Sequence, residues 1–436
     1  LVEEEKGKTV PQVPKHTINF GVEGGTGGTL KAQVDGKEIN SGDSVEQGKS
    51  VVFTAEPAPD YVVEQWTNGG TVIAEAGMDT SYTYAVTANA DIKVKFQSLF
   101  VEGGASLILS PDKLDITVEV RTTYSTPITV EGCTETTLPS GAQTVLHATS
   151  TRVILKGNIT KLECSGTYND NNKLTALNVQ GLTALQRLYC GYNQFTAFDV
   201  QGLSALQYLD CSNNRLTALD VQGCTALQEL YCGYNQLTTL DVQGLSTLQY
   251  LDCDNNQLTA LDVQGLSALQ WLWCYNNRLT ALNVQGCTAL EGLWCYNNRL
   301  TALNIQGCTA LRGLDCYNNQ LTELDVQGLT TLRGLDCWSN QLTALNVQGL
   351  SALKSLSCYN NKLTAQAFTK LFDDLPARQD SDKGECILYT EESGVSEGNH
   401  TDFSTPEALK TAFNNAKNNK KWKMYKWNGS WPGVEI

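Results

Sequence analysis

LQYLDCSNNRLTALDVQGCTA (residues 206–226) and LQWLWCYNNRLTALNVQGCTA (residues 269–289) are two copies of one 21-residue repeat. Both fit the leucine-rich-repeat pattern L-x-x-L-x-L-x-x-N-x-L, with a cysteine in place of the third leucine. In the first copy the fixed positions are held by Leu206, Leu209, Cys211, Asn214 and Leu216. A free cysteine behaves as a small apolar residue, so it suits an inward-facing position. The pattern predicts one short parallel strand per repeat, which can bury its apolar side only against its neighbours.

The repeat extends over residues 159–364 and predicts a curved solenoid of about ten turns, called rungs below, with a parallel sheet on its concave face. A longer first rung contains Ile159, Leu162 and Cys164, and the last rung reaches Cys358. At the usual strand spacing of ~4.8 Å, the stack would be roughly 45 Å long. The predicted fold class is α+β and rich in β-structure.

Two side chains recur in register along the repeats. Nine of the 15 cysteines occur every 21 residues from Cys190 to Cys358, whereas zinc sites need short spacings such as C-x-x-C, which this chain lacks. We therefore expect a buried ladder of reduced thiols, because apolar surroundings raise the pKa of a thiol. The asparagines three residues after these cysteines, such as Asn214 and Asn277, are expected to bond the backbone of neighbouring turns.

Other domains are predicted before the solenoid. Short alternating apolar runs separated by turn residues predict a small all-β module over residues 17–97. Residues 98–158 contain further short β-runs and are expected to form a β-rich N-terminal cap. Residues 1–16 begin with the acidic segment LVEEEKGKTV and are expected to be a linker left after removal of an export signal.

An α/β C-terminal cap is predicted over residues 365–436, where the period breaks. Amphipathic patterns favour helices over residues 365–376 and 405–419. Residues 385–390 read as a strand, and residues 421–431 alternate as an edge strand.

Charge and composition exclude several classes of protein. The net charge of −15 argues against nucleic acid as a partner, because phosphate binding needs clustered Lys and Arg. No run approaches the ~20 apolar residues of a membrane-spanning segment. The three histidines are scattered, and neither a Ser-His-Asp arrangement nor a phosphate-binding loop is present. We therefore predict no enzyme activity, no catalytic residues and no cofactor.

The concave face is the candidate binding site. Side chains that flank the inward Leu and Cys of each strand point to this face, and they vary while the inward positions stay nearly constant. Exposed Trp and Tyr are typical of interaction sites, although stacking that only stabilises the sheet is the alternative. The candidate ligand-binding residues are Trp271, Trp273, Tyr275, Trp294, Tyr296, Asp315, Tyr317, Asp336, Trp338 and Tyr359. We interpret the aromatic members as one contiguous surface, beside a low groove floor at Gly292, Gly313, Gly334 and Ser355.

Asp315 and Asp336 would stand roughly 5 Å apart on neighbouring strands. That separation resembles the carboxylate pair of a retaining glycosidase, but any residue repeated in a ladder has the same spacing. Arg312 and Arg333 are close enough in sequence to pair with them. A calcium site would need more oxygen ligands than two carboxylates, so no metal site is predicted.

The combination of period 21, a cysteine at the third apolar position and an asparagine three residues later resembles the cysteine-ladder repeats of internalin J-type bacterial surface proteins. The stretch LTALDVQGCTALQELYCGYNQ (216–236) carries this resemblance, and residues 27–70 resemble the divergent B-repeat module of internalins. The resemblance implies an exported bacterial protein, at the cell surface or secreted, with an adhesin-like role. The chain ends in WPGVEI without a sorting motif, and its β module precedes the repeats, which suggests an N-terminal lipid anchor.

Three functions remain open at this point. The concave face could bind a protein on a host or neighbouring cell surface, or it could bind a glycan through the same aromatic residues. A structural spacer without a ligand is the third reading.

Overall fold

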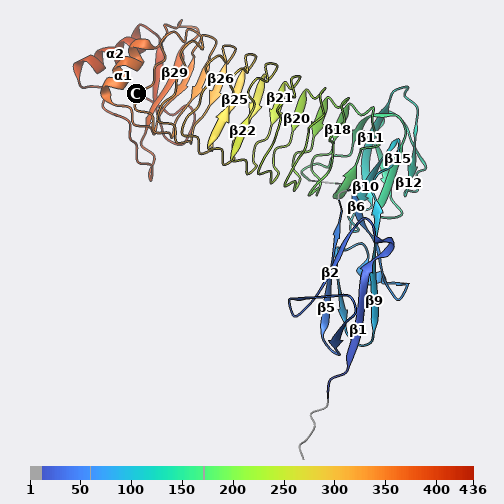
Figure 1. Cartoon of the computed structure of the whole chain (residues 1–436). Coiled ribbons are helices and arrows are strands. Elements are labelled where there is room, and N and C mark those ends of the chain that lie inside the picture. The colour runs from blue at the N-terminus through green and yellow to red at the C-terminus, as the bar shows by residue number, and fades with distance from the viewer. Residues whose placement is uncertain (1–11, 59, 170–171) are drawn as a thin grey trace, which may run out of the picture. The chain divides into compact units, whose positions relative to one another are not determined.

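The computed structural model describes residues 12–58, 60–169 and 172–436. Most of the expected linker over residues 1–16 lies outside these described residues. The chain folds into two compact units, and the boundary between them in the sequence falls between Phe100 and Val101. Figure 1 shows the N-terminal unit in blue and the row of repeat strands that makes up most of the second unit.

The N-terminal unit consists of two β-sheets. One sheet has the strand order β4-β1-β9-β6-β7 and the other has the order β3-β2-β5-β8. Their strands are β1 (Lys15–Val22), β2 (Gly28–Val34), β3 (Lys37–Ile39), β4 (Asp43–Glu46), β5 (Ser50–Pro57), β6 (Tyr61–Asn68), β7 (Thr71–Val72), β8 (Ser81–Ala85) and β9 (Ala90–Ser98). Alternating apolar residues such as Ile18, Phe53 and Trp66 are fully buried between them. The predicted all-β module is confirmed.

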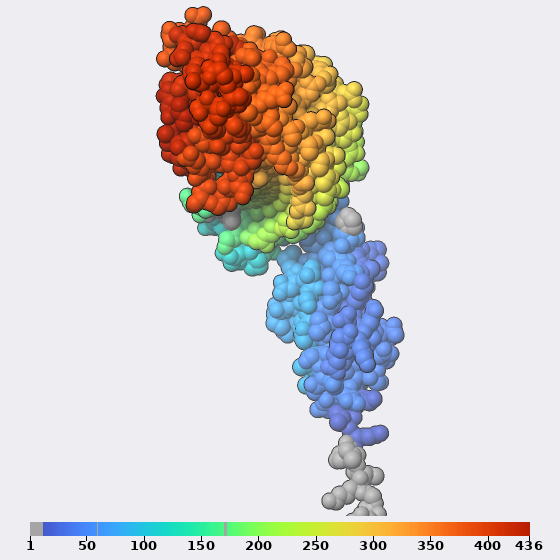
Figure 2. Space-filling model, turned by 90° about the vertical axis from the view of Figure 1, so that its left-hand side faces the viewer, coloured from blue at the N-terminus to red at the C-terminus, as the bar shows by residue number. Residues whose placement is uncertain are grey.

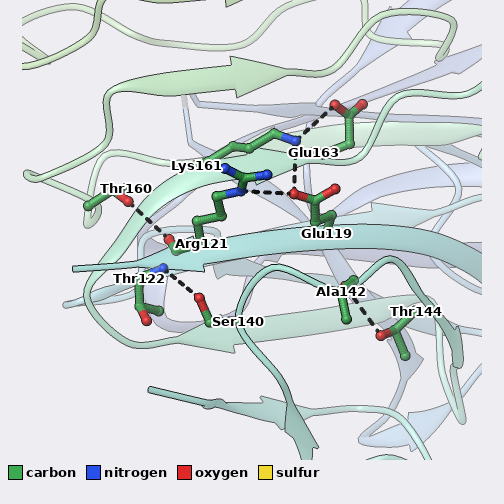
Figure 3. A network of polar contacts seen from close by, with 9 residues as sticks. All are labelled: Glu119, Arg121, Thr122, Ser140, Ala142, Thr144, Thr160, Lys161 and Glu163. Atoms are coloured by element: carbon green, nitrogen blue, oxygen red, sulfur yellow. Dashed lines mark hydrogen bonds and ion pairs between the residues drawn. The ribbon is translucent and has the colours of Figure 1, made fainter. Parts of the chain in front are cut away.

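Further β-strands close the N-terminal end of the solenoid. They are β10 (Gly104–Leu109), β11 (Asp115–Thr122), β12 (Ile128–Glu131), β13 (Thr137–Leu138), β14 (Thr144–His147), β15 (Arg152–Lys156) and β17 (Leu174–Asn178). Strand β11 pairs antiparallel with the first rung strand, β16 (Ile159–Glu163). Across this pair Lys161 Nζ lies 3.0 Å from Glu119 Oε1, which also accepts a hydrogen bond from Arg121 Nε (Figure 3). Strand β11 therefore covers a sheet edge that would otherwise be open.

The solenoid is a stack of parallel three- to five-residue strands in one long sheet. Its ten rung strands are β16, β18 (Arg187–Tyr189), β19 (Tyr208–Asp210), β20 (Glu229–Tyr231), β21 (Tyr250–Asp252), β23 (Trp271–Trp273), β25 (Gly292–Trp294), β26 (Gly313–Asp315), β27 (Gly334–Asp336) and β28 (Ser355–Ser357). The central leucines pair in register, as Leu251 does with Leu272 and Leu272 with Leu293. Elsewhere in the repeat, β22 (Ala260–Asp262) and β24 (Ala281–Asn283) form a separate two-stranded sheet. The predicted leucine-rich-repeat solenoid is confirmed.

The two predicted ladders lie in its interior. Cys274 and its counterparts in the other rungs are 0% exposed and are free thiols, and burial raises the pKa of Cys274 well above its usual value. Asn277 Nδ2 donates to the backbone oxygens of Cys253 at 3.0 Å, Cys274 at 3.2 Å and Tyr275 at 3.3 Å. Its Oδ1 accepts from the backbone nitrogen of Leu258 at 2.9 Å. The asparagine ladder therefore bonds neighbouring turns, as predicted.

The C-terminal region continues the sheet and packs two helices beside it. Its elements are α1 (Ala365–Asp374), β29 (Gly384–Thr390), α2 (Glu407–Asn418), β30 (Trp422–Trp427) and β31 (Val434–Glu435). Both predicted helices are present, and Thr364 caps α1 by accepting a hydrogen bond from the backbone nitrogen of Ala367. No helix among the described residues is long and apolar enough to cross a bilayer.

The prediction of an edge strand over residues 421–431 is wrong. Strand β30 ends at Trp427 and is internal to the sheet, since it pairs in parallel with β29 and antiparallel with β31. The chain reverses after Trp427, with Gly429 and Gly433 at positive φ, and β31 therefore becomes the last strand of the sheet.

Candidate binding surface

The ten candidate residues all lie on the strands of the sheet or just beyond them. Five of them lie within strands β23, β25, β26 and β27, namely Trp271, Trp273, Trp294, Asp315 and Asp336. The other five follow a strand end by two residues, namely Tyr275, Tyr296, Tyr317, Trp338 and Tyr359. Half-exposed Trp271 and Trp273 flank Leu272, which is 0% exposed, so the side chains alternate as the sequence predicts.

Six aromatic rings form one continuous stack, which we call the aromatic ladder. Its members in order are Tyr275, Tyr296, Tyr317, Trp338, Tyr359 and Trp427. Successive ring centroids lie 4.4, 4.4, 4.2, 5.0 and 5.7 Å apart, and the planes are tilted by 10° or less. Each inner ring is therefore covered on both faces by its neighbours, and the ladder presents mainly ring edges.

Trp271, Trp273 and Trp294 form a second group, which we call the tryptophan cluster. Their centroids are 5.3 to 6.0 Å apart and their planes are nearly parallel. Within the described ranges no ring contact joins this cluster to the aromatic ladder. The candidate aromatic rings are therefore stacked in two groups.

The predicted groove floor also needs correction at one of its three glycines. A Cβ at Gly292 would collide with the ring of Trp294 and lie 2.7 Å from Trp271 Cε3, so the tryptophan cluster covers this position. At Gly313 and Gly334 an added Cβ would meet nothing within 4 Å. The groove floor is therefore open at Gly313 and Gly334, whereas the tryptophan rings cover Gly292.

A hollow of about 430 Å³ lies where the aromatic ladder meets the C-terminal strands, and we call it the C-terminal hollow. Its lining includes Asp336, Trp338, Tyr359, Glu392, Trp427 and Trp431. Figure 2 views the molecule from this end and shows a recess beside the C-terminal residues. Tyr359 is only 7% exposed, because Ile387, Tyr425 and Trp427 pack against it. The expectation that Tyr359 is an exposed part of the surface is therefore wrong.

The two predicted carboxylates have no basic partner. Burial, reinforced by the charge of Asp336, raises the pKa of Asp315 to about 7, although a hydrogen bond with Trp294 opposes the shift. Burial likewise raises the pKa of Asp336. The predicted pairing with Arg312 is wrong, since that arginine lies 3.1 Å from Glu291 instead. For the described residues no ion pair within 4.0 Å involves Asp315, Asp336 or Arg333.

Three features of this face lie outside the ten candidate residues. Trp427 extends the aromatic ladder from outside the repeats, where no period marks its position. Tyr208 stacks with Tyr189 at 4.4 Å and contacts Tyr231 at 5.4 Å, which makes a further aromatic group in the early rungs. Asp254 is 2% exposed although its position in the repeat is an outward one. The alternation that located the tryptophans also places the early tyrosines on this face, although they are not among the candidate residues.

Family models match two regions of the chain. Residues 18–99 match the divergent InlB B-repeat domain. Residues 204–246 and 225–268 match leucine-rich repeats. A comparison with curated proteins found no match.

Solved structures with similar repeats come from several bacteria. The functional domain of InlJ from Listeria monocytogenes, described as including a cysteine ladder, is 34% identical over 56% of this chain and 52% of its own, with a TM-score of 0.47. A leucine-rich-repeat protein of Leptospira interrogans is 22% identical over 58% of this chain and 82% of its own, with a TM-score of 0.40. YopM of Yersinia pestis, described as a leucine-rich effector protein, is 28% identical over 48% and 54%, with a TM-score of 0.40.

The match to InlJ spans about half the length of that structure. The two family matches fall on the two units of the fold, one on the all-β module and one on the central rungs. The chain is a leucine-rich-repeat protein that carries a divergent InlB B-repeat domain ahead of its solenoid.

Proposed function

We propose that this chain is a non-enzymatic binding protein of a bacterium, at the cell surface or secreted, which recognises a protein ligand through the concave face of its repeats. The observation that carries the proposal is the group of half-exposed aromatic rings on or just beyond strands β23 to β27, beside carboxylates that have no basic partner among the described residues. The core does not need these outward rings, and Trp and Tyr are the residues that contribute most to protein interfaces. The divergent InlB B-repeat match at residues 18–99 supports the exported role.

The acids give the ligand a preferred chemistry. Asp315 and Asp336 lie among the aromatic side chains, and Glu392 lines the C-terminal hollow with Asp336. A ligand segment with basic side chains would supply the missing counter-charges, and binding would weaken as salt screens the exposed part of this attraction.

Glycan binding through the same residues is less well supported. A sugar ring packs against the face of an aromatic side chain, whereas the faces within the aromatic ladder already cover each other at 4.2 to 5.7 Å. The tryptophan cluster is also stacked internally. Edge-presenting rings suit the mixed apolar and polar surface of a protein better than the flat face of a sugar.

The test compares three forms of the chain in a protein pull-down and on a glycan array. They are the wild type, a Trp273→Ala/Trp294→Ala double variant, and Tyr124→Ala, which removes an 80% exposed tyrosine outside the concave face. We expect a protein partner whose binding falls at least about tenfold in the double variant and is unchanged in Tyr124→Ala.

Each other result would overturn the proposal in its own way. Binding that survives the double variant would rule out the tryptophan cluster as the site. A tryptophan-dependent glycan signal without a protein partner would support the glycan reading. A wild type that binds in neither screen would support the spacer reading.

A further inference from the structure

A buried carboxylate in the middle of the concave face has an oxygen without a hydrogen-bond partner. Asp254 follows strand β21 and is 2% exposed. Its Oδ2 accepts a hydrogen bond from Asn255 Nδ2 at 3.0 Å, whereas its Oδ1 is buried and has no donor. Burying a charged oxygen without a donor or a positive charge costs free energy, so this atom requires an explanation.

A second carboxylate lies beside the first. Asp252 is the last residue of β21, and its carboxyl group lies within hydrogen-bonding reach of the Asp254 carboxyl group. Asp252 Oδ1 also accepts from the backbone nitrogen of Asp254 at 3.1 Å. A Cβ at Gly233 would collide with Asp254 Oδ1 and lie 3.2 Å from Asp252 Oδ1. Because residue 233 is a glycine, oxygens of both carboxylates occupy the space above this position.

The surroundings add negative charge and no counter-charge. Asp210 on β19 repels the Asp252 carboxylate, and Tyr231 on β20 donates its hydroxyl hydrogen to Glu229 at 3.0 Å. The Tyr275 hydroxyl hydrogen-bonds Asp254. No Lys or Arg lies within 4.0 Å of the Asp252 or Asp254 carboxylates in the part of the chain that the structure describes.

We propose that Asp252 and Asp254 bind a hydrated divalent cation, Ca²⁺ or Mg²⁺, through the carboxylate oxygens that converge beside Gly233. Hard cations prefer carboxylate oxygens, and Mg²⁺ is often held by one or two carboxylates with water in its remaining positions. No group of three or more Asp, Glu, His or Cys side chains in the described ranges is arranged to hold a metal, so water supplies the rest of the shell. Such a site has the affinity of extracellular modules, on the order of 10⁻⁴–10⁻³ M.

This site differs from the one considered from the sequence at Asp315 and Asp336. The two later aspartates lie on different strands, and among the described residues neither has an oxygen that is both buried and without a hydrogen-bond partner. Asp252 and Asp254 lie on one chain segment and converge over a glycine. The inference does not depend on the identity of any protein ligand.

Terbium luminescence tests the site directly. Trp273 on β23 is the register partner of Asp252, so excitation of tryptophan should sensitise Tb³⁺ bound there. In the full chain we expect saturable Tb³⁺ emission that Ca²⁺ or Mg²⁺ displaces. Asp254→Asn should weaken Tb³⁺ binding at least about tenfold, and Asp315→Asn, which alters an acid hydrogen-bonded to Trp294, should leave this binding unchanged.

Thermal unfolding supplies a second measurement. In EDTA the Tm of Asp254→Asn should equal or exceed that of the wild type, because the variant removes a buried charge without a partner. Added Ca²⁺ should raise the Tm of the wild type by several degrees and that of Asp254→Asn by much less. If Asp254→Asn does not fold, Asp252→Asn provides the same comparison at the less buried carboxylate.

Two results would overturn the proposal. One is a wild-type Tm that does not change at divalent cation concentrations about ten times the upper end of the expected range, while Asp254→Asn destabilises the chain. The other is Tb³⁺ emission that Asp254→Asn leaves intact. Either result would mean that the two carboxyl groups do not hold a cation.

Discussion

The inward and outward side chains of the same short strands follow different rules. Inward, Leu272, Cys274 and Asn277 have equivalents in every neighbouring rung, and the leucine and cysteine are 0% exposed. Outward, Trp271 and Trp273 give way to Gly292 and Trp294 one rung later. Close packing and buried hydrogen bonds leave the interior little freedom, whereas the concave face can change without loss of the fold. The comparison separates what holds the solenoid together from what is available for binding.

The largest effect is expected from the interior asparagine ladder. Asn277→Ala removes three donated hydrogen bonds and leaves the backbone nitrogen of Leu258 buried without an acceptor. We expect a loss of about 2–4 kcal/mol in the free energy of unfolding, measured by urea denaturation. The control is Asn318→Gly on the exposed side, where φ is +52° and glycine is tolerated, and it should have a much smaller effect. Equal losses would contradict the division between interior and surface.

The cysteine ladder should come next. Cys274→Ser places a hydroxyl in a site that is 0% exposed and lined by apolar residues, and we expect it to cost about 1–3 kcal/mol in urea denaturation. Cys274→Ala, which leaves only a small cavity, should cost less although serine is closer to cysteine in shape. The opposite order would show that the thiol acts as a polar group and not as an apolar one.

On the concave face, stability should depend on pH. The pKa of Asp315 is 3.8 in its ordinary state and about 7 in the fold, so the folded chain binds the extra proton between these values. The contribution of Asp315 to stability is therefore largest below about pH 4, is lost as the pH rises through 7, and does not change further above that. The part due to Asp315 should be about 1–2 kcal/mol after allowance for solvent screening. Urea midpoints in EDTA at pH 5 and pH 8 should differ less in Asp315→Asn than in the wild type.

The smallest effect on stability is expected within the aromatic ladder. Tyr317 stacks at 4.4 Å on Tyr296 and at 4.2 Å on Trp338, so Tyr317→Leu should cost about 0.5–1.5 kcal/mol. Tyr124→Leu, at an exposed site outside the ladder, serves as the control for removing a tyrosine. If Tyr317→Leu lowers the free energy of unfolding as much as Asn277→Ala does, the aromatic ladder helps to hold the solenoid together. Its outward side chains would then be as constrained as the inward ones.

Much of the candidate binding surface could be predicted, because successive side chains of a strand point to opposite faces of the sheet. Once Leu272 and Cys274 are placed inward, Trp271, Trp273 and Tyr275 must point outward, and the structure has them half-exposed. The same reasoning failed for Tyr359, because its exposure depends on strands β29 and β30, which lie outside the repeats. The predicted pairing of Arg312 failed for a different reason. A long side chain can reach several partners, and Arg312 pairs with Glu291 and not with Asp315.

The sequence by itself determined the solenoid, its rung length, its two interior ladders and the direction of each side chain, since a strict 21-residue period with inward Leu, Cys and Asn permits one way of stacking. Only the tertiary structure decided how the outward side chains combine. It put Trp427 at the end of the aromatic ladder, folded Trp294 over Gly292, and brought Asp252 and Asp254 together above Gly233. Those outcomes depend on side-chain rotamers and on contacts between rungs, and a repeat pattern fixes neither.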